Sequence, residues 1–207
     1  MRLQPTARGH ADLILPMVDE LLRESTLALS DFDVLAFGRG PGSFTGVRIA
    51  VAVIQGLALA AGKPVVGVST LAAVAHRAVV GLTAGARILV CMDARMGEVY
   101  WAEFQVIDDL NCQLASAERV GAPMTVDVEG ERLTVGVGTG WRAYPQLRAR
   151  YPRLHIDDAV LPRAIDIAYL ARAEFRAGHA TSAAQAQPVY LRDNVVARSG
   201  TSSVTSM

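Results

Sequence analysis

Gly38-Arg39-Gly40-Pro41-Gly42-Ser43-Phe44-Thr45-Gly46-Val47-Arg48 is the stretch of this sequence that decides its fold. The apolar run Val34-Leu35-Ala36-Phe37 precedes it, and an apolar segment from 45 to 61 follows it. Four glycines and one proline between them allow the backbone to turn sharply. The pattern predicts a buried strand, a tight turn and a helix, which is the local unit of an α/β fold with a mixed sheet.

The same turn has the composition of a phosphate-binding loop. Gly40, Gly42, Ser43, Thr45 and Gly46 could face an anion, with Ser43 or Thr45 capping the helix that follows. However, no Gly-Lys-Ser/Thr follows, and Thr45 stands where the last glycine of Gly-x-Gly-x-x-Gly is required. We therefore favour a structural turn over a phosphate cradle, and we expect that no ATP or ADP is required.

Two helices are predicted around the first strand. The segment 11–24 carries apolar residues at helical spacing, with Pro16 inside it, and the segment 45–61 is apolar on nearly every face and ends at Gly62. A helix that is apolar all round must be covered on all sides. Two interpretations stay open, an ordinary core and an association surface. The candidate residues of that surface are Ile14, Met17, Val18, Leu21, Ile49, Val53, Gly56 and Leu57.

The remaining pattern is that of further strands and helices, with a weak, polar region at 107–132. Strands are expected at 65–68, 87–92, 99–106 and 133–137, and helices at 69–80 and 162–177. Pro162 is expected at the first position of the last helix, with Ile165, Ala168, Leu170, Ala171 and Phe175 on its inner side.

A boundary between two lobes is expected within 75–87. We therefore predict an N-terminal lobe at 1–78, a C-terminal lobe at 79–198 and a disordered Ser/Thr-rich tail at 199–207. Asp93, Arg95 and Glu98 form the best charged cluster, for which we favour a hairpin turn with a local ion pair over a functional site.

Composition excludes some classes of protein. Hydrophobic residues make up 51% of the chain, and 20 basic residues balance 20 acidic ones. Autonomous RNA binding is therefore disfavoured, although a local arginine patch stays open. The cysteines, Cys91 and Cys112, fit a reducing compartment. We find no signal peptide, and we judge the apolar stretch 49–62 too short for a membrane span, so we expect a cytoplasmic protein.

Catalytic constellations are not visible in the sequence. The histidines, His10, His76, His155 and His179, are isolated, so we expect no metal site. Ser43 lacks the Gly-x-Ser-x-Gly context of a nucleophile. We expect no catalytic residues.

The segments taken together resemble the TsaB (YeaZ) family. The motifs that carry the resemblance are 14–18, the glycine turn continuing into Ile54-Gln55-Gly56-Leu57-Ala58-Leu59, Gly67-Val68-Ser69-Thr70-Leu71, Asp93-Ala94-Arg95-Met96-Gly97-Glu98-Val99-Tyr100-Trp101, Val137-Gly138-Thr139-Gly140-Trp141 and Gln187-Pro188-Val189-Tyr190-Leu191-Arg192-Asp193-Asn194. The resemblance implies two lobes of an actin-like, Hsp70-like ATPase (ribonuclease H-like) fold. It also implies a non-catalytic scaffold or activator in the addition of threonylcarbamoyl to N6 of adenosine 37 in tRNAs that read codons beginning with A.

The expected partners follow from the same resemblance. They are a TsaD-type catalytic subunit and a TsaE-type ATPase, with a homodimer as an alternative and with tRNA contacted only through the complex. The first two helices are then the docking surface. The alternative functions are a weak, sugar-kinase-like ATPase and an inactive homologue of M22-type peptidases.

The start of the chain departs from the family pattern. Family members begin with a strand that carries an Asp-Thr-Ser/Thr motif and with a hairpin, whereas this sequence begins almost at the first helix. We therefore expect an incomplete N-terminal lobe with an exposed sheet edge, and poor stability of the 207-residue chain alone.

Overall fold

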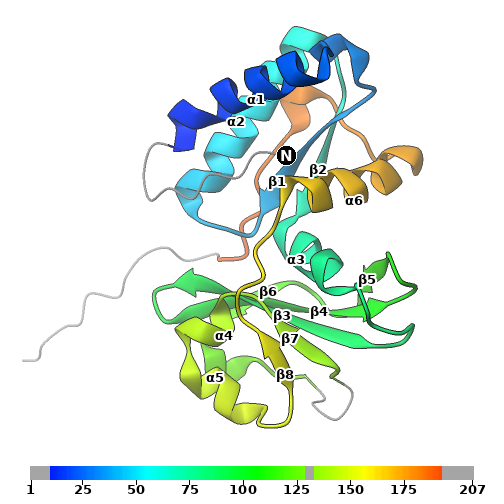
Figure 1. Cartoon of the computed structure of the whole chain (residues 1–207). Coiled ribbons are helices and arrows are strands. Elements are labelled where there is room, and N and C mark those ends of the chain that lie inside the picture. The colour runs from blue at the N-terminus through cyan, green and yellow to red at the C-terminus, as the bar shows by residue number, and fades with distance from the viewer. Residues whose placement is uncertain (1–9, 129–132, 193–207) are drawn as a thin grey trace, which may run out of the picture.

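The fold consists of two groups of helices and strands, each built around its own sheet (Figure 1). The structure, a computed structural model, describes residues 10–128 and 133–192. The first group holds α1 (His10–Ser25), η1 (Leu29–Asp31), β1 (Leu35–Gly40), α2 (Phe44–Ala61), β2 (Val65–Ser69), α6 (Ala164–Arg176) and η4 (Ala183–Gln185). The second holds α3 (Thr70–Ala78), β3 (Arg87–Arg95), β4 (Glu98–Val106), β5 (Cys112–Leu114), β6 (Arg119–Gly121), η2 (Pro123–Thr125), β7 (Val135–Val137), α4 (Gly140–Ala143), α5 (Pro145–Arg150) and β8 (His155–Asp157).

The first sheet is a parallel pair, β1 and β2, with helices on both faces. Alternate residues of a strand point to opposite faces, so each face has its own apolar cluster. Phe37 and Val65 pack with α2 on one face, whereas Val66 and Val68 pack with Ile167 of α6 on the other. The glycine turn therefore connects β1 to the helix that covers one face of this sheet.

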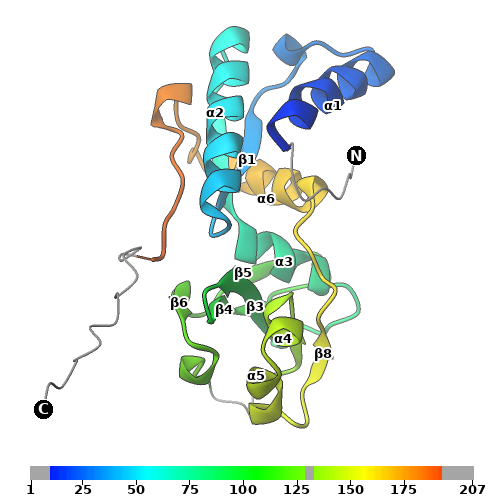
Figure 2. The ribbon, with the colours of Figure 1, turned by 90° about the vertical axis from the view of Figure 1, so that its left-hand side faces the viewer.

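The second sheet is mixed and has the strand order β5-β4-β3-β7-β8, with β6 also paired to β4. Its face toward the first sheet is covered by α3, which contributes Leu71 and Val74 to a cluster with Ile88 and Phe104. Its other face is covered by α4 and α5 through Trp141 and Leu147. Figure 2 shows α3 in its place between the two sheets.

A buried carboxylate, that of Asp166, joins α3 to α6. The Nδ1 atom of His76 lies 2.9 Å from Oδ1 of Asp166, whose side chain is only 2% exposed. Arg163 binds the same carboxylate through its Nε atom at 2.8 Å. Burial acts to raise the pKa of Asp166, but the hydrogen bonds from Arg163 and His76 outweigh it and lower that pKa. The contacts of Asp166 fix the position of α6 relative to α3.

Most of the predicted elements are confirmed, including the first two helices, the strand before the glycine turn and the antiparallel hairpin of β3 and β4. The left-handed cap at Gly62 is also present, with φ of 63°. In the predicted polar region, β5 and β6 form because β4 offers them paired edges. The mixed α/β fold class is therefore correct.

Several predictions about the last helix are wrong. The helix begins at Ala164 with Arg163 as its cap, so Pro162 does not occupy the first position. Ile165 and Ala168 are exposed, and Asp166 and Ile167 take the inner face instead. Leu170, Ala171 and Phe175 do lie on the inner side, as predicted, where they pack in the cluster of Val66 and Val68. Ile165 was placed wrongly because the buried position beside it belongs to Asp166, a charged residue.

The lobe boundaries at 78 and 198 stay a prediction. The packing adds that α6 contacts β1 and β2, while η4 contacts α2, so the chain returns to the first sheet after β8. The predicted disordered tail at 199–207, the chain start at 1–5 and the motif residues Asp193 and Asn194 lie outside the described residues.

The argument from length against a membrane span needs correction. By length and composition alone, α2 would be long and apolar enough to cross a membrane, and 22% of it is buried. Its four buried residues pack in the first group, where they line up on one face of the helix. This packing is the reason to interpret α2 as part of an α/β domain. The cytoplasmic location of the protein stays a prediction.

Candidate partner-binding surface

Helix α1 is the least covered helix of the first group. None of its residues from 11 to 25 is buried, although its sequence is amphipathic. Its apolar residues Ile14, Met17, Val18 and Leu21 are half-buried, and Leu15 is 51% exposed. Helices in globular proteins gain most of their stability from packing of the apolar face. Part of the apolar face of α1 is therefore still available for packing.

Helix α2 is apolar on its uncovered side as well. Its buried residues are Val47, Val51, Ile54 and Ala58, which form one stripe toward β1. The other faces are also largely apolar, although the polar residues Thr45, Arg48 and Gln55 lie there too. The exposed or half-buried apolar residues on those faces include Ile49, Ala50, Ala52, Val53, Gly56, Leu57, Leu59 and Ala60.

An apolar groove runs between α1, η1 and α2. Its volume is about 440 Å³, and Val18 and Leu21 of α1 face Ile54 and Leu57 of α2 across it. Phe32 also lines it and is 36% exposed. We call the groove and the uncovered side of α2 together the helix face.

The structure places all eight predicted surface residues on these two helices. Gly56 is exposed with open space around it, and the other seven are half-buried. The prediction missed Leu59, which is 79% exposed, and Phe44, which is 52% exposed. The exposure of each residue shows which side of an all-apolar helix is free, and the sequence alone does not give this exposure.

The glycine turn is explained by local geometry. Gly40 has φ of 100°, and a Cβ atom there would lie 3.0 Å from the Val189 carbonyl oxygen. Ser43 caps α2 by accepting a hydrogen bond from the Gly46 N–H at 3.1 Å. Thr45 lies in the first turn of the helix and is exposed, so it is not the cap. This geometry supports the structural turn, because Ser43 uses its oxygen within the helix.

A second hollow of about 580 Å³ opens beside the turn and involves residues that the sequence analysis missed. The Arg48 guanidinium lies 3.6 Å above the ring of Phe44, and its Nε atom donates to the Tyr190 hydroxyl at 2.9 Å. Both rings are about half exposed. A guanidinium held by two aromatic rings is a pre-organised donor at one end of the helix face.

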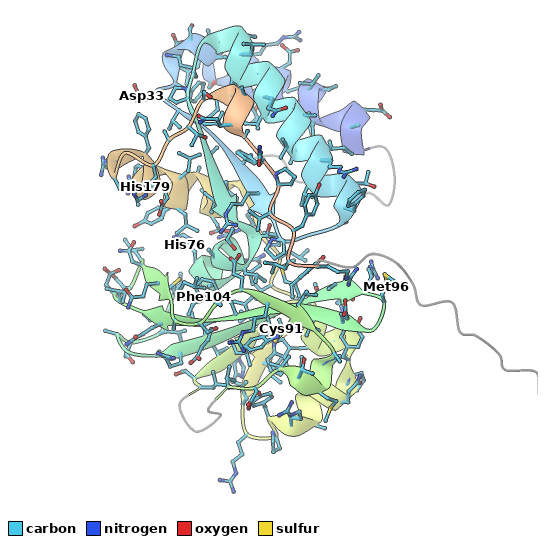
Figure 3. All side chains as sticks on the ribbon, turned by 180° about the vertical axis from the view of Figure 1, so that it is seen from behind. Asp33, His76, Cys91, Met96, Phe104 and His179 are labelled. Carbon is cyan, nitrogen blue, oxygen red and sulfur yellow. The ribbon has the colours of Figure 1, made fainter. Side chains whose placement is uncertain are left out.

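The predicted charged cluster at 93–98 is a hairpin turn, as favoured. Asp93 pairs with Arg95 at 3.0 Å and accepts a hydrogen bond from Tyr144 at 3.0 Å. Burial raises the pKa of Tyr144, and the Asp93 carboxylate adds to that rise. Glu98 does not join the local pair; it binds Arg192 at 2.8 Å instead. Figure 3 shows Met96 at the tip of this hairpin.

The titratable side chains do not assemble into a metal centre within the described residues, where no group of three His, Cys, Asp or Glu side chains could hold a metal ion. His76 pairs with Asp166, and His179 pairs with Glu174 at 2.7 Å. Figure 3 shows the two histidines well apart, His76 on α3 and His179 beyond the end of α6.

Comparisons with known proteins give a consistent result. Residues 4–198 match the family model described as TsaD: tRNA N6-adenosine threonylcarbamoyltransferase. The Escherichia coli K12 protein named tRNA threonylcarbamoyladenosine biosynthesis protein TsaB is 43% identical over 91% of this chain and 83% of its own length. The protein of the same name from Haemophilus influenzae is 38% identical over 91% of this chain and 82% of its own.

Solved structures agree with these relatives. A crystal structure described as an uncharacterized protein with similarity to peptidase YEAZ from Pseudomonas aeruginosa is 42% identical, with a TM-score of 0.81 over 91% of this chain and 87% of that chain. A second structure, described as YeaZ from Pseudomonas aeruginosa, is 43% identical, with a TM-score of 0.77 over 87% of this chain and 85% of that chain.

Proposed function

Because the chain belongs to the TsaB (YeaZ) family of tRNA threonylcarbamoyladenosine biosynthesis proteins, we propose that it is a non-catalytic scaffold subunit of that pathway. Its fold is that of the actin-like ATPase family. In this proposal the helix face binds a TsaD-type catalytic subunit, which carries out the transfer of threonylcarbamoyl to adenosine 37.

The observation that carries the proposal is the uncovered helix face. α1 contributes no buried residue from 11 to 25, and α2 buries only one stripe of its 18 residues. Contiguous apolar surface that stays exposed on a folded domain is typical of protein interaction sites. The small residues Ala52 and Gly56 allow a partner helix to approach the α2 backbone closely.

The remaining parts of the proposal concern partners and cofactors. A TsaE-type ATPase is a second partner, and tRNA is contacted through the assembled complex, which the balance of basic and acidic residues supports. A homodimer forms through the same helix face when the catalytic subunit is absent, because an apolar face favours a self-complementary contact. No nucleotide is required by this chain itself, and the complex works in the cytoplasm.

A reconstituted reaction tests the proposal. The full chain, a TsaD-type subunit and a TsaE-type ATPase from the same organism are combined with tRNA and the threonylcarbamoyl donor, and modified adenosine is measured. We expect no product from this chain alone, and a rate with the TsaD-type subunit that rises when this chain is added. Product formation by this chain without the TsaD-type subunit would overturn the scaffold role.

The same mixture separates the scaffold from the ATPase alternative. Ser43→Ala combined with Thr45→Ala removes both hydroxyls from the glycine turn but leaves the helix face intact. We expect this double variant to stimulate modification as well as the parent chain does, once its folding has been checked by circular dichroism. Loss of stimulation together with loss of ATP hydrolysis by this chain would favour the ATPase.

A further inference from the structure

Three polar side chains meet where the two sheets face each other. β1 and β2 run parallel and end side by side, with Gly40 opposite Ser69. Arg39 lies at the end of β1, and Ser69 ends β2 and caps α3. Glu118 reaches this point from the second sheet, where it stands between β5 and β6.

The contacts of Glu118 join the two groups of elements. The Ser69 hydroxyl donates to one carboxylate oxygen of Glu118, and Nη2 of Arg39 lies 3.6 Å from the other. The Glu118 side chain is only 9% exposed. The oxygen of Ser69 also accepts hydrogen bonds from the N–H groups of Leu71 and Ala72 at 3.1 and 3.2 Å. Glu118 is thus bound through Ser69 to the first turn of α3.

The carboxyl ends of β1 and β2 are a kind of location where α/β proteins often bind ligands. In open α/β sheets, ligands bind outside the carboxyl ends of parallel strands, and the N-terminus of the helix that follows favours anions. A hydroxyl and a guanidinium at such a place are donors suited to phosphate oxygens. In this protein those donors already hold a carboxylate that comes from the other sheet.

We propose that Glu118 is an internal latch, which fills the anion position between the sheets and excludes phosphate-bearing ligands from it. The carboxylate of Glu118 occupies the donors of Arg39 and Ser69, so a phosphate could not bind them. Its negative charge would also repel a phosphate in this largely desolvated place. The latch also ties the second sheet to the ends of β1 and β2. It acts on the chain itself, so it does not depend on the scaffold role.

Two other contacts hold the two groups of elements together and do not occupy the anion position. The Tyr100 hydroxyl reaches the Gly42 carbonyl oxygen at 3.4 Å, which is a long hydrogen bond. The Glu98–Arg192 pair crosses from the hairpin to the segment after η4. These contacts should keep the two sheets near each other when the latch is removed, so that a vacated anion position stays formed.

Isothermal titration of the full chain with pyrophosphate and with Mg-ATP tests the latch. We expect Glu118→Ala to bind at least one of these probes roughly tenfold more tightly than the parent chain, or more. Glu118→Gln keeps the size of the side chain and removes its charge, so we expect a gain in the same direction. Hydrogen exchange at Val120 and Gly121 should rise in both variants, because the loop before β6 loses its anchor.

Two controls define the outcome. Asp109→Asn removes an equally negative but exposed side chain from the segment between β4 and β5, and it should leave binding unchanged. Adding Arg39→Ala to Glu118→Ala should abolish the gain. The latch is wrong if folded Glu118→Ala and Glu118→Gln bind no better than the parent chain, or if the parent chain already binds as tightly as they do.

Discussion

Leu21 of α1 and Leu57 of α2 line the same apolar groove, and neither is fully buried. The two residues belong to helices that cover the outer side of the first group of elements (Figure 1). The two helices pack together but remain incompletely covered. Both side chains are half-buried, and this is the observation on which we base the proposal of an association surface rather than an ordinary core.

The cap of α2 predicts opposite effects for two glycines in the same helix. A Cβ atom at Gly46 would lie 2.7 Å from the Ser43 hydroxyl that caps the helix, whereas nothing lies within 4 Å of a Cβ atom at Gly56. Gly46→Ala should lower the free energy of unfolding by about 1 kcal/mol through the damaged cap. Gly56→Ala should raise it by about 0.5–1 kcal/mol, because alanine is the better helix former.

Chemical denaturation of both variants, followed by circular dichroism, measures the difference. Equal stability of the two variants would contradict the account of the glycine turn as a helix cap.

The carboxylate of Asp166 predicts a pH dependence of stability. Its pKa is lowered in the folded state, so its contribution is present above the ordinary carboxylate pKa of about 3.9 and is lost as the pH falls through the lower folded value. Asp166→Asn should cost about 3 kcal/mol at neutral pH, because His76 and Arg163 lose a buried partner.

The difference between parent and variant should shrink as the pH falls below about 4. Urea denaturation at several pH values measures this, with the exposed Asp109→Asn as the control that should cost little. A loss from Asp166→Asn that is the same at all pH values would contradict the ion pair.

The two cysteines predict slow thiol chemistry in the native protein. Burial raises the pKa of Cys91 well above its ordinary value and that of Cys112 to about 11. The thiolate is the reactive form, so labelling by a disulfide reagent at pH 8 should be slow and should quicken in denaturant. Cys112, which is half-buried, should react first as the pH is raised. Rapid labelling of both thiols in the folded protein would count against the packing of the second sheet.

Much of the fold follows from local signals in the sequence. The strand β1, the capped helix α2 and the hairpin of β3 and β4 each have a clear pattern, because their apolar periodicity agrees with their turn residues. The sequence analysis ended β1 at Phe37, whereas the strand continues to Gly40. β5, β6 and β8 have three residues each, and neighbouring strands decide their pairing. Such short strands carry too few residues for a period to be recognised.

The surface was predictable only in part. The two helices were identified by composition, since an all-apolar helix must be covered. The stacked group of Phe44, Arg48 and Tyr190 joins residues at opposite ends of the chain, so no local pattern reveals it. The contact of Glu118 with Ser69 is likewise long-range and forms only when the two sheets come together.

The central claim, that the helix face binds the catalytic partner, is tested most directly by one affinity measurement on a matched pair of variants. Ala52 and Ala173 are both exposed alanines within helices, the first on the helix face and the second on α6. The dissociation constant of each glutamate variant for the TsaD-type subunit is measured by titration calorimetry. We predict that Ala52→Glu weakens binding by roughly a hundredfold or more, since a charge becomes buried at the contact, and that Ala173→Glu binds like the parent chain. Unchanged binding by a folded Ala52→Glu variant would contradict the claim.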